Sequence, residues 1–162
     1  MQIPSPQAVV DAIIAVISDR LDHNISVAEH AAASATHEEA RAEDKYDTRG
    51  LEMSYLAAGA SDRAETLRVV LMNYRGWRRP PVDPQHIAPG ALIGLEDDDG
   101  NERVVFLAPF GDGERVVVDG ITVQGVTLKA PLGEALHRRG EGEEISIVVA
   151  GQRRQWAIEK VC

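Results

Sequence analysis

The sequence predicts an α+β protein, in which an N-terminal antiparallel helical hairpin (coiled coil) is followed by a small antiparallel sheet domain with one helix. Three observations support this prediction. From Gln7 to Tyr74 the chain has no proline, and its apolar residues recur at helical spacing. Four prolines then fall between residues 80 and 89, and beyond them apolar and polar residues alternate as in strands. We expect a hairpin over 1–79, a linker over 80–90 and a sheet domain over 91–162.

The first helix should begin at Ser5 and Pro6, an N-cap residue followed by the proline that helices favour in their first turn. Its middle allows two interpretations. Ser26 and Glu29 form a possible capping box, so the helix is either continuous or broken near residues 23–26. The apolar positions that define its early face are Val10, Ile13, Ile14, Ile17 and Leu21.

The second helix should follow a turn at residues 47–50 and end near Arg75, because Gly76 and the later prolines stop a helix. Two long helices joined by a short turn pack antiparallel. From Ala28 to Ala42 the residues are mostly small or charged, so the far half of the hairpin is a thin rod. Arms of ~27 residues would be roughly 40 Å long. A dimerisation arm is the alternative use for such a rod.

Six segments after the linker have the composition of strands, with turn dipeptides between several of them. The segment PLGEALHRRG reads as one short helix, since proline opens it and glycine ends it. The expected strands are ALIGLED, ERVVFLAP, ERVVVDG, ITVQGVT, EISIVVA and QWAIEKV.

Composition excludes several classes of protein. The formal net charge is −9 and both halves are acidic, which argues against specific DNA binding. The only cysteine is Cys162, so an intramolecular disulfide is impossible and a reducing cytoplasm fits best. The N-terminus lacks the basic start of a signal peptide, and no apolar stretch approaches the ~20 residues that span a membrane. We therefore expect a cytoplasmic protein without membrane contact.

The sequence contains no self-sufficient catalytic motif. His23, His30 and His37 are seven residues apart, which separates successive rings on a helix by about 10 Å, too far to share one metal ion. The GDG at 111–113 lies in a hairpin-like setting rather than between a strand and a helix, so it is not a phosphate loop. No serine has the glycine-strained surroundings of a nucleophile elbow.

The turn of the hairpin carries the strongest chemical signal. Carboxylates at the end of a rod are suited to a hard divalent cation, but magnesium keeps waters and also needs phosphates or further carboxylates. The missing ligands would come from another molecule, so the pattern indicates a tip donated to a partner's active site. The acids are Glu43, Asp44, Asp47 and Glu52, interleaved with Arg41, Lys45 and Arg49.

Two segments resemble the Gre family of bacterial transcript cleavage factors, and the resemblance covers the whole chain. SYLAAG after the tip is similar to the family's Tyr-x-Ala-Ala segment. The stretch APLGEALHRRGEGEEISI is similar to the family pattern Ser-Pro-(Ile/Leu)-x-x-Ala-Leu-x-x-(Lys)-x-x-Gly-(Asp/Glu), the more specific match. Its matching positions are Pro131, Leu132, Ala135, Leu136, Gly142 and Glu143.

This resemblance implies an elongation factor whose hairpin enters the secondary channel of RNA polymerase. The tip acids would help to hold the polymerase's second Mg²⁺ and a water that hydrolyses backtracked RNA, with indirect contact to the RNA 3′ end. The chain would be a cofactor of the polymerase rather than an enzyme. Its C-terminal domain would be FKBP-like and dock on the polymerase, with Pro131 and Leu132 as the expected contacts.

The tip departs from the family pattern, in which an aspartate and a glutamate stand three residues apart. An alignment on Asp47 puts Gly50 in place of the second acid, whereas an alignment on Tyr55 puts Thr48 and Leu51 in place of the two acids. Asp44 and Asp47 form a substitute pair, which we predict to be the catalytic and metal-binding residues, with Glu43, Lys45, Arg49 and Glu52 as auxiliary tip residues. Two alternatives stay open: a channel binder that inhibits or modulates the polymerase without cleavage, and a coiled-coil homodimeric scaffold. The sequence does not predict the oligomeric state.

Overall fold

The computed structural model describes residues 1–41 and 48–162. The chain divides into two compact units. The hairpin unit is Ile17–Met72, and the sheet unit combines Met1–Val16 with Asn73–Cys162. The sheet unit therefore includes the start of the first helix and the end of the second, in addition to the domain expected from the change in composition.

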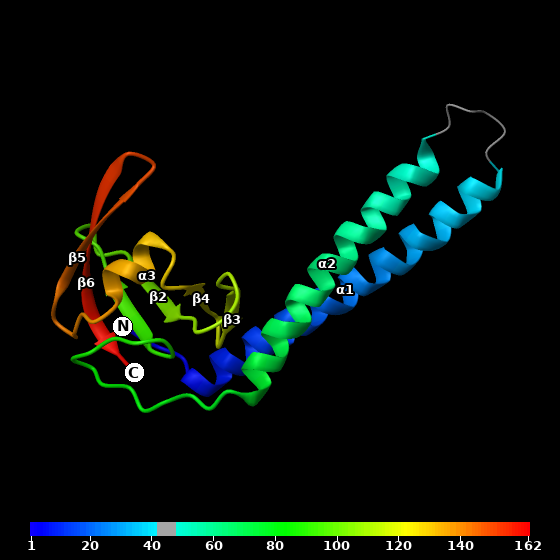
Figure 1. The fold of residues 1–162 in the computed structure, drawn as a ribbon. Coiled ribbons are helices and arrows are strands. Elements are labelled where there is room, and N and C mark those ends of the chain that lie inside the picture. Colours follow the sequence, from blue (N-terminus) through cyan, green and yellow to red (C-terminus); the bar gives the residue numbers. More distant parts are fainter. Residues whose placement is uncertain (42–47) are drawn as a thin grey trace. The chain divides into compact units, whose positions relative to one another are not determined.

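Two long helices form the hairpin (Figure 1): α1 is Pro6–Arg41 and α2 is Arg49–Gly76. α1 is one continuous helix of 36 residues, so the alternative of a break near residues 23–26 is wrong. Polar side chains there bond within the helix: the amide of Asn24 donates to the carbonyl of Arg20 at 2.8 Å. The helical backbone bonding continues through this segment. A serine three residues before a glutamate is therefore not sufficient to end the helix.

The buried positions of the hairpin unit follow the spacing of a coiled-coil seam. Large side chains fill the seam near the sheet-unit end of the helices, and alanines fill it toward the turn, which confirms the small residues predicted there. Helices that meet through alanine bury little apolar area, so this part of the hairpin gains little stability from packing. The buried seam residues are Ile17, Leu21, Ala31 and Ala35 on α1, and Ala60, Ala64 and Leu71 on α2.

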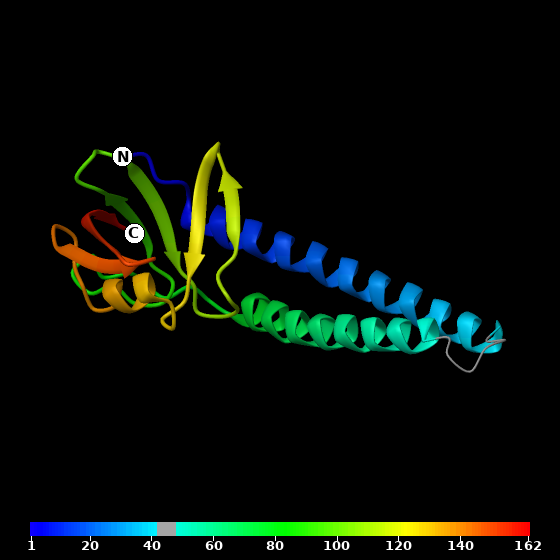
Figure 2. The same ribbon diagram turned by 90° about the horizontal axis from the view of Figure 1, so that it is seen from above.

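The sheet unit holds six strands in the order β3-β4-β2-β1-β6-β5 (Figure 2). Neighbours pair antiparallel except β2 and β4, which run parallel. Alternation of side chains has the same period in both kinds of pairing, so the sequence did not reveal the parallel pair. The strands are β1 Leu92–Glu96, β2 Glu102–Leu107, β3 Arg115–Val118, β4 Ile121–Val126, β5 Glu144–Val149 and β6 Gln152–Val161.

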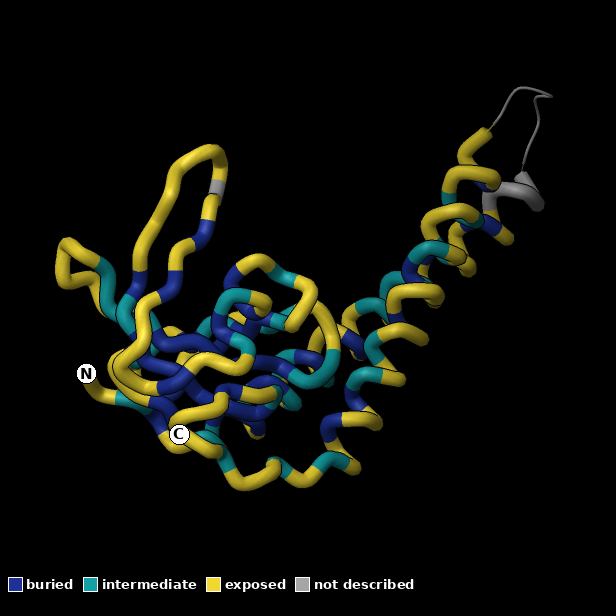
Figure 3. The backbone as a smooth tube through the Cα atoms, turned by 60° about the vertical axis from the view of Figure 1, so that its left-hand side comes forward, coloured by how far each residue is buried: buried dark blue, intermediate teal, exposed yellow. Residues whose placement is uncertain are grey.

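The core of the sheet unit lies between the sheet and α3, Pro131–Leu136. Leu132 and Leu136 bring α3 into this core. Figure 3 marks all buried residues, those of the hairpin included, in dark blue. The proline-rich segment also contributes, because Ile87 is fully buried. The backbone of Ile87 exchanges hydrogen bonds of 2.8 Å with Arg138 and Arg139, so this part of the expected linker is fixed to the end of α3.

Three aromatic rings lie together where α2 ends. Tyr74 and Phe110 meet edge to face with centroids 5.3 Å apart, and Trp77 lies 6.2 Å from Phe110. The Tyr74 hydroxyl donates to the carbonyl of Phe110 at 3.3 Å. Burial, with a smaller contribution from the charge of Glu114, raises the pKa of Tyr74 to about 12. The end of α2 is therefore held to the connection between β2 and β3.

Candidate functional site

The predicted tip residues Glu43, Asp44, Lys45 and Asp47 lie outside the described residues. Their roles stay predictions. The described chain reaches Arg41 at the end of α1 and resumes at Thr48, directly before α2. In the sequence, residues 42–47 join the end of α1 to the residue before α2.

Two hydrogen bonds at the start of α2 hold Glu52, one of the predicted auxiliary acids. The backbone N–H of Glu52 donates to the carbonyl of Thr48 at 3.0 Å, and the Thr48 hydroxyl donates to the Glu52 carboxylate at 3.4 Å. A carboxylate in the first turn also interacts favourably with the helix dipole. Glu52 thus has a structural reason for its position, while Arg49 is exposed in the same turn.

A polar contact crosses the middle of the hairpin seam. The guanidinium Nε of Arg63 on α2 donates to the side-chain oxygen of Asn24 on α1 at 3.2 Å. Asn24 continues the heptad spacing of Ile17 and Leu21, and it is half-buried. A single polar residue at such a position fixes the register of the two helices at some loss of stability. This register determines which residues stand at the turn.

The histidines do not form a site in the described residues. The Nδ1–H of His30 donates to the Ser26 carbonyl at 2.7 Å, which ties the ring to its own helix. His23 and His30 border a shallow hollow of about 300 Å³ that Met53 and Leu56 of α2 also line. Across residues 1–41 and 48–162, no three histidine, cysteine or acidic side chains are grouped to hold a metal ion.

α3 presents the predicted docking motif. Pro131 is exposed at the first helical position, whereas Leu132 is 7% exposed and belongs to the core. Ala130 stands at the N-cap without a side-chain bond, where the family has serine. Of the two residues predicted to bind polymerase, Pro131 is therefore the one at the surface, and Leu132 supports it from beneath.

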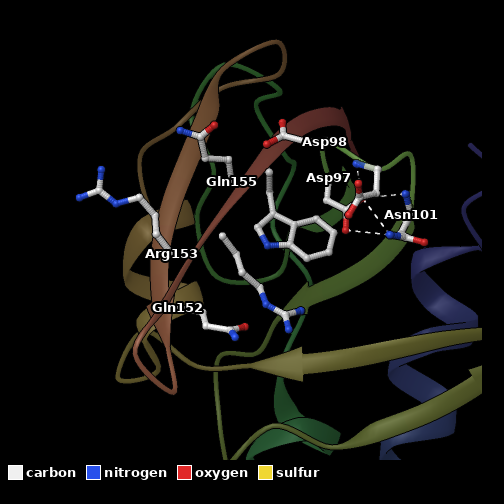
Figure 4. A pocket seen from close by; sticks show the side chains of 9 residues that line it. Asp97, Asp98, Asn101, Gln152, Arg153 and Gln155 are labelled. Atoms are coloured by element: carbon white, nitrogen blue, oxygen red, sulfur yellow. Dashed lines mark hydrogen bonds between the residues drawn. The ribbon is translucent and has the colours of Figure 1, made fainter.

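A second hollow, of about 370 Å³, lies on the sheet unit between the β1–β2 turn and β6 (Figure 4). Its acidic turn is bonded internally: the Asp97 carboxylate accepts from the backbone of Asp99 and from the backbone and side chain of Asn101 at 2.8–3.1 Å. These bonds, led by the Asn101 side chain, lower the pKa of Asp97. Asp97 is therefore a turn residue and a poor general base.

The indole of Trp156 also borders this hollow. Its Nε1 is buried without a hydrogen-bond partner among the described residues, and the guanidinium of Arg103 lies 5.1 Å from the ring centroid. Arg153 points away from the hollow in Figure 4. The sequence does not predict this hollow, because the β1–β2 turn and β6 are more than fifty residues apart in the chain.

Among the described helices, none is both long and apolar enough to cross a membrane. The chain matches no protein-family model and no curated protein.

Solved structures similar to this chain include GreA factor homolog 1 (Gfh1) of Thermus thermophilus, with 18% identity over 92% of this chain and 94% of that one, and a TM-score of 0.40. Gfh1 of Thermus aquaticus has 20% identity over 90% of each chain and a TM-score of 0.41. The elongation factor GreA/GreB of Nitrosomonas europaea has 19% identity over 61% of this chain and 78% of that one, with a TM-score of 0.39.

Proposed function

We propose that this protein is a Gre-like transcription elongation factor, which binds RNA polymerase and inserts its hairpin tip into the secondary channel. The observation that carries the proposal is the pair of uninterrupted helices, of 36 and 28 residues, whose connection is the acidic segment. At 1.5 Å per residue the shorter helix is about 42 Å long, which is enough to bring side chains at the turn to a buried active site. The protein then acts in the cytoplasm with its partner.

Asp47 and Asp44 are the residues that we assign to the chemistry. Their carboxylate oxygens suit Mg²⁺, which needs further ligands from the polymerase and the RNA and is not held by this chain alone. When bound, Mg²⁺ activates water and stabilises charge on phosphate. Lys45 and Arg49 would contact RNA phosphate or polymerase acids, with Glu43 as a further acid. The bond of Glu52 to Thr48 supports a structural role for that auxiliary acid.

The second candidate function is channel binding without cleavage, which inhibits or modulates the polymerase. Gly50 at the position of the family's second acid favours it, since glycine offers no oxygen ligand from a side chain. The two candidates share the docking motif with Pro131 and differ only in the chemistry of the tip.

Stalled, backtracked elongation complexes test both candidates. The wild-type protein should shorten the RNA from its 3′ end, and Asp47→Ala should slow this cleavage by on the order of 10²-fold, the typical loss for one transition-state group. Asp44→Ala should slow it as well, whereas Ser26→Ala, at an exposed position in the middle of α1, should not. Binding that slows elongation without cleavage identifies the second candidate. A wild-type protein that does not bind the polymerase overturns the proposal.

A further inference from the structure

The exposed hydrophobic side chains of the hairpin unit are unevenly distributed. Among its described residues, every large hydrophobic side chain that is exposed lies on α2, and none lies on α1. Isolated exposed hydrophobics are normal, whereas hydrophobics that gather on one surface are candidates for an interaction site. The residues and their exposed fractions are Leu51 55%, Tyr55 70%, Leu56 44%, Val69 51% and Met72 66%.

Four of these side chains fall on one line along α2. The positions repeat at alternating intervals of four and three residues, so they share a face of the helix. This face is opposite the seam, which passes through Ala60, Ala64 and Leu71. We call it the outer stripe; it consists of Leu51, Tyr55, Ala58, Asp62, Glu65, Val69 and Met72, all exposed.

The outer stripe is apolar at both ends and acidic at its centre. Leu51 and Tyr55 form the end beside the turn, and Val69 and Met72 form the other end. The midpoints of the two pairs are about 26 Å apart at 1.5 Å per residue. Asp62 and Glu65 stand between them. Glu65 makes an exposed ion pair with Arg68 at 2.9 Å, of a kind that contributes little energy and leaves the carboxylate accessible to a partner.

This order of charges disfavours a second copy of the chain as the occupant. If two copies paired through the outer stripe in parallel, Asp62 and Glu65 would each face themselves. If they paired antiparallel with the apolar ends matched, Asp62 would face Asp62 across the two-fold axis. Like charges placed opposite each other in an interface disfavour the association. A complementary occupant carries basic groups between two apolar hollows.

We propose that the outer stripe of α2 is the face of the hairpin that docks on a partner protein with two apolar hollows about 26 Å apart and a basic surface between them. The inference rests on the proposed function, which makes this partner the wall of the polymerase channel. α1 would face the remaining space of the channel, because its exposed residues include Asp19, Asp22 and Glu29 and no large hydrophobic.

Equilibrium binding of the full chain to RNA polymerase tests the inference. Tyr55→Ala combined with Met72→Ala should raise Kd about tenfold or more, the effect of removing buried interface anchors. In association kinetics, Asp62→Lys should slow binding and weaken the salt dependence of its rate. Val117→Ala, a comparable loss from a 65% exposed side chain on β3, should leave Kd unchanged. Far-ultraviolet circular dichroism verifies that each variant keeps its helix content.

The outcomes separate this inference from the proposed function. If the wild-type chain does not bind polymerase, the proposed function fails. If it binds, and the outer-stripe variants bind equally well, the outer stripe is not the docking face although the function stands. Analytical ultracentrifugation is the second measurement: a wild-type dimer that Tyr55→Ala with Met72→Ala converts to a monomer would show that a second copy occupies the face, and would overturn the inference.

Discussion

Gly133 shows how one residue sets the position of α3. It is buried, and it is the third residue of the PLG sequence that opens the helix. A Cβ atom at this position would meet the carbonyl oxygen of Thr127, and it would also lie 3.4 Å from Leu107. Only glycine therefore lets α3 pack this closely against the segment that follows β4.

We predict that Gly133→Ala destabilises the sheet unit by about 1–3 kcal/mol, since an added methyl in a packed interior forces the backbone apart. Trp77 and Trp156, the only two tryptophans, both belong to this unit, so denaturant unfolding followed by tryptophan fluorescence measures the change. Gly76→Ala is the matched control, because nothing lies within 4 Å of its added Cβ. It should change the free energy of unfolding by less than about 0.5 kcal/mol. Equal losses in both variants would contradict the assignment.

For single residues, the sequence predicts the local position of a residue in a helix better than its contacts with distant segments. Pro131 and the buried leucines of α3 follow from local patterns, namely a proline in the first turn and apolar residues four apart. The contact of Gly133 with Thr127 and that of Arg103 with Trp156 join segments that only the fold brings together. The tip acids remain sequence predictions throughout.

The apolar seam of the hairpin is interrupted by one polar contact between the two helices that the described residues show. Its polar contact between Asn24 and Arg63 lies among apolar seam positions. We predict that Asn24→Leu raises the stability of the hairpin by about 1 kcal/mol, because an apolar side chain replaces a half-buried amide in the seam. Thermal unfolding followed by circular dichroism at 222 nm should show a higher midpoint.

Asn73→Leu is the matched control for this variant, since it makes the same change at an exposed position near the end of α2. Its effect should stay within about 0.5 kcal/mol. A lower midpoint for Asn24→Leu would show that the bond with Arg63 contributes more than the apolar packing that replaces it. Ultracentrifugation of this variant also reports whether loss of the polar contact permits another helix register or association.

The two long helices were predicted more accurately than the short helix or the strand boundaries. The short helix was expected over PLGEALHRRG, but α3 ends at Leu136. Pro6 and Gly76 mark the outer ends of the two helices, as expected from their preferences for those positions. β6 begins at Gln152, three residues before the predicted Gln155. The reason is the two-residue turn at Ala150 and Gly151, whose positive φ values of 51° and 77° make the polar residues after it pair with β5.

For the molecule as a whole, the aromatic cluster around Tyr74 links the stability of the sheet unit to alkaline pH. The pKa of Tyr74 is raised from 10.0 to about 12, so the folded state keeps the phenol protonated. The stability that the buried, protonated phenol contributes is fully present below pH 10, where Tyr74 is neutral in both the folded and the unfolded state. It is lost as pH rises from about 10 to about 12, because there the unfolded chain releases the proton first.

Tyr74→Phe should therefore lose less stability than the wild type between pH 10 and 12, as measured by fluorescence-detected unfolding. At neutral pH it should be less stable by about 0.5–1.5 kcal/mol, the usual net value of one hydrogen bond. Tyr55→Phe removes a hydroxyl from a 70% exposed ring and should follow the wild-type profile. Parallel alkaline profiles for Tyr74→Phe and the wild type would contradict this account.

The two-part composition of the chain was predictable, whereas the role of the proline-rich segment was not. Its prolines indicate a linker, yet Ile87 within it is fully buried and its backbone is bonded to the residues after α3. A single apolar residue among prolines gives no periodic signal, so its burial follows only from the assembled core. The compact units likewise reflect contacts that composition does not record.

The two outermost strands of the sheet expose backbone groups that could recruit strands from other molecules and lead to aggregation. β3 is only four residues long, and its outward-facing Val117 stands between the charged residues Arg115 and Asp119. On the opposite border, Val148 of β5 is paired with Arg153. Such gatekeeper charges disfavour stacking of sheets edge to edge. We therefore expect these charges to disfavour aggregation through the two edge strands.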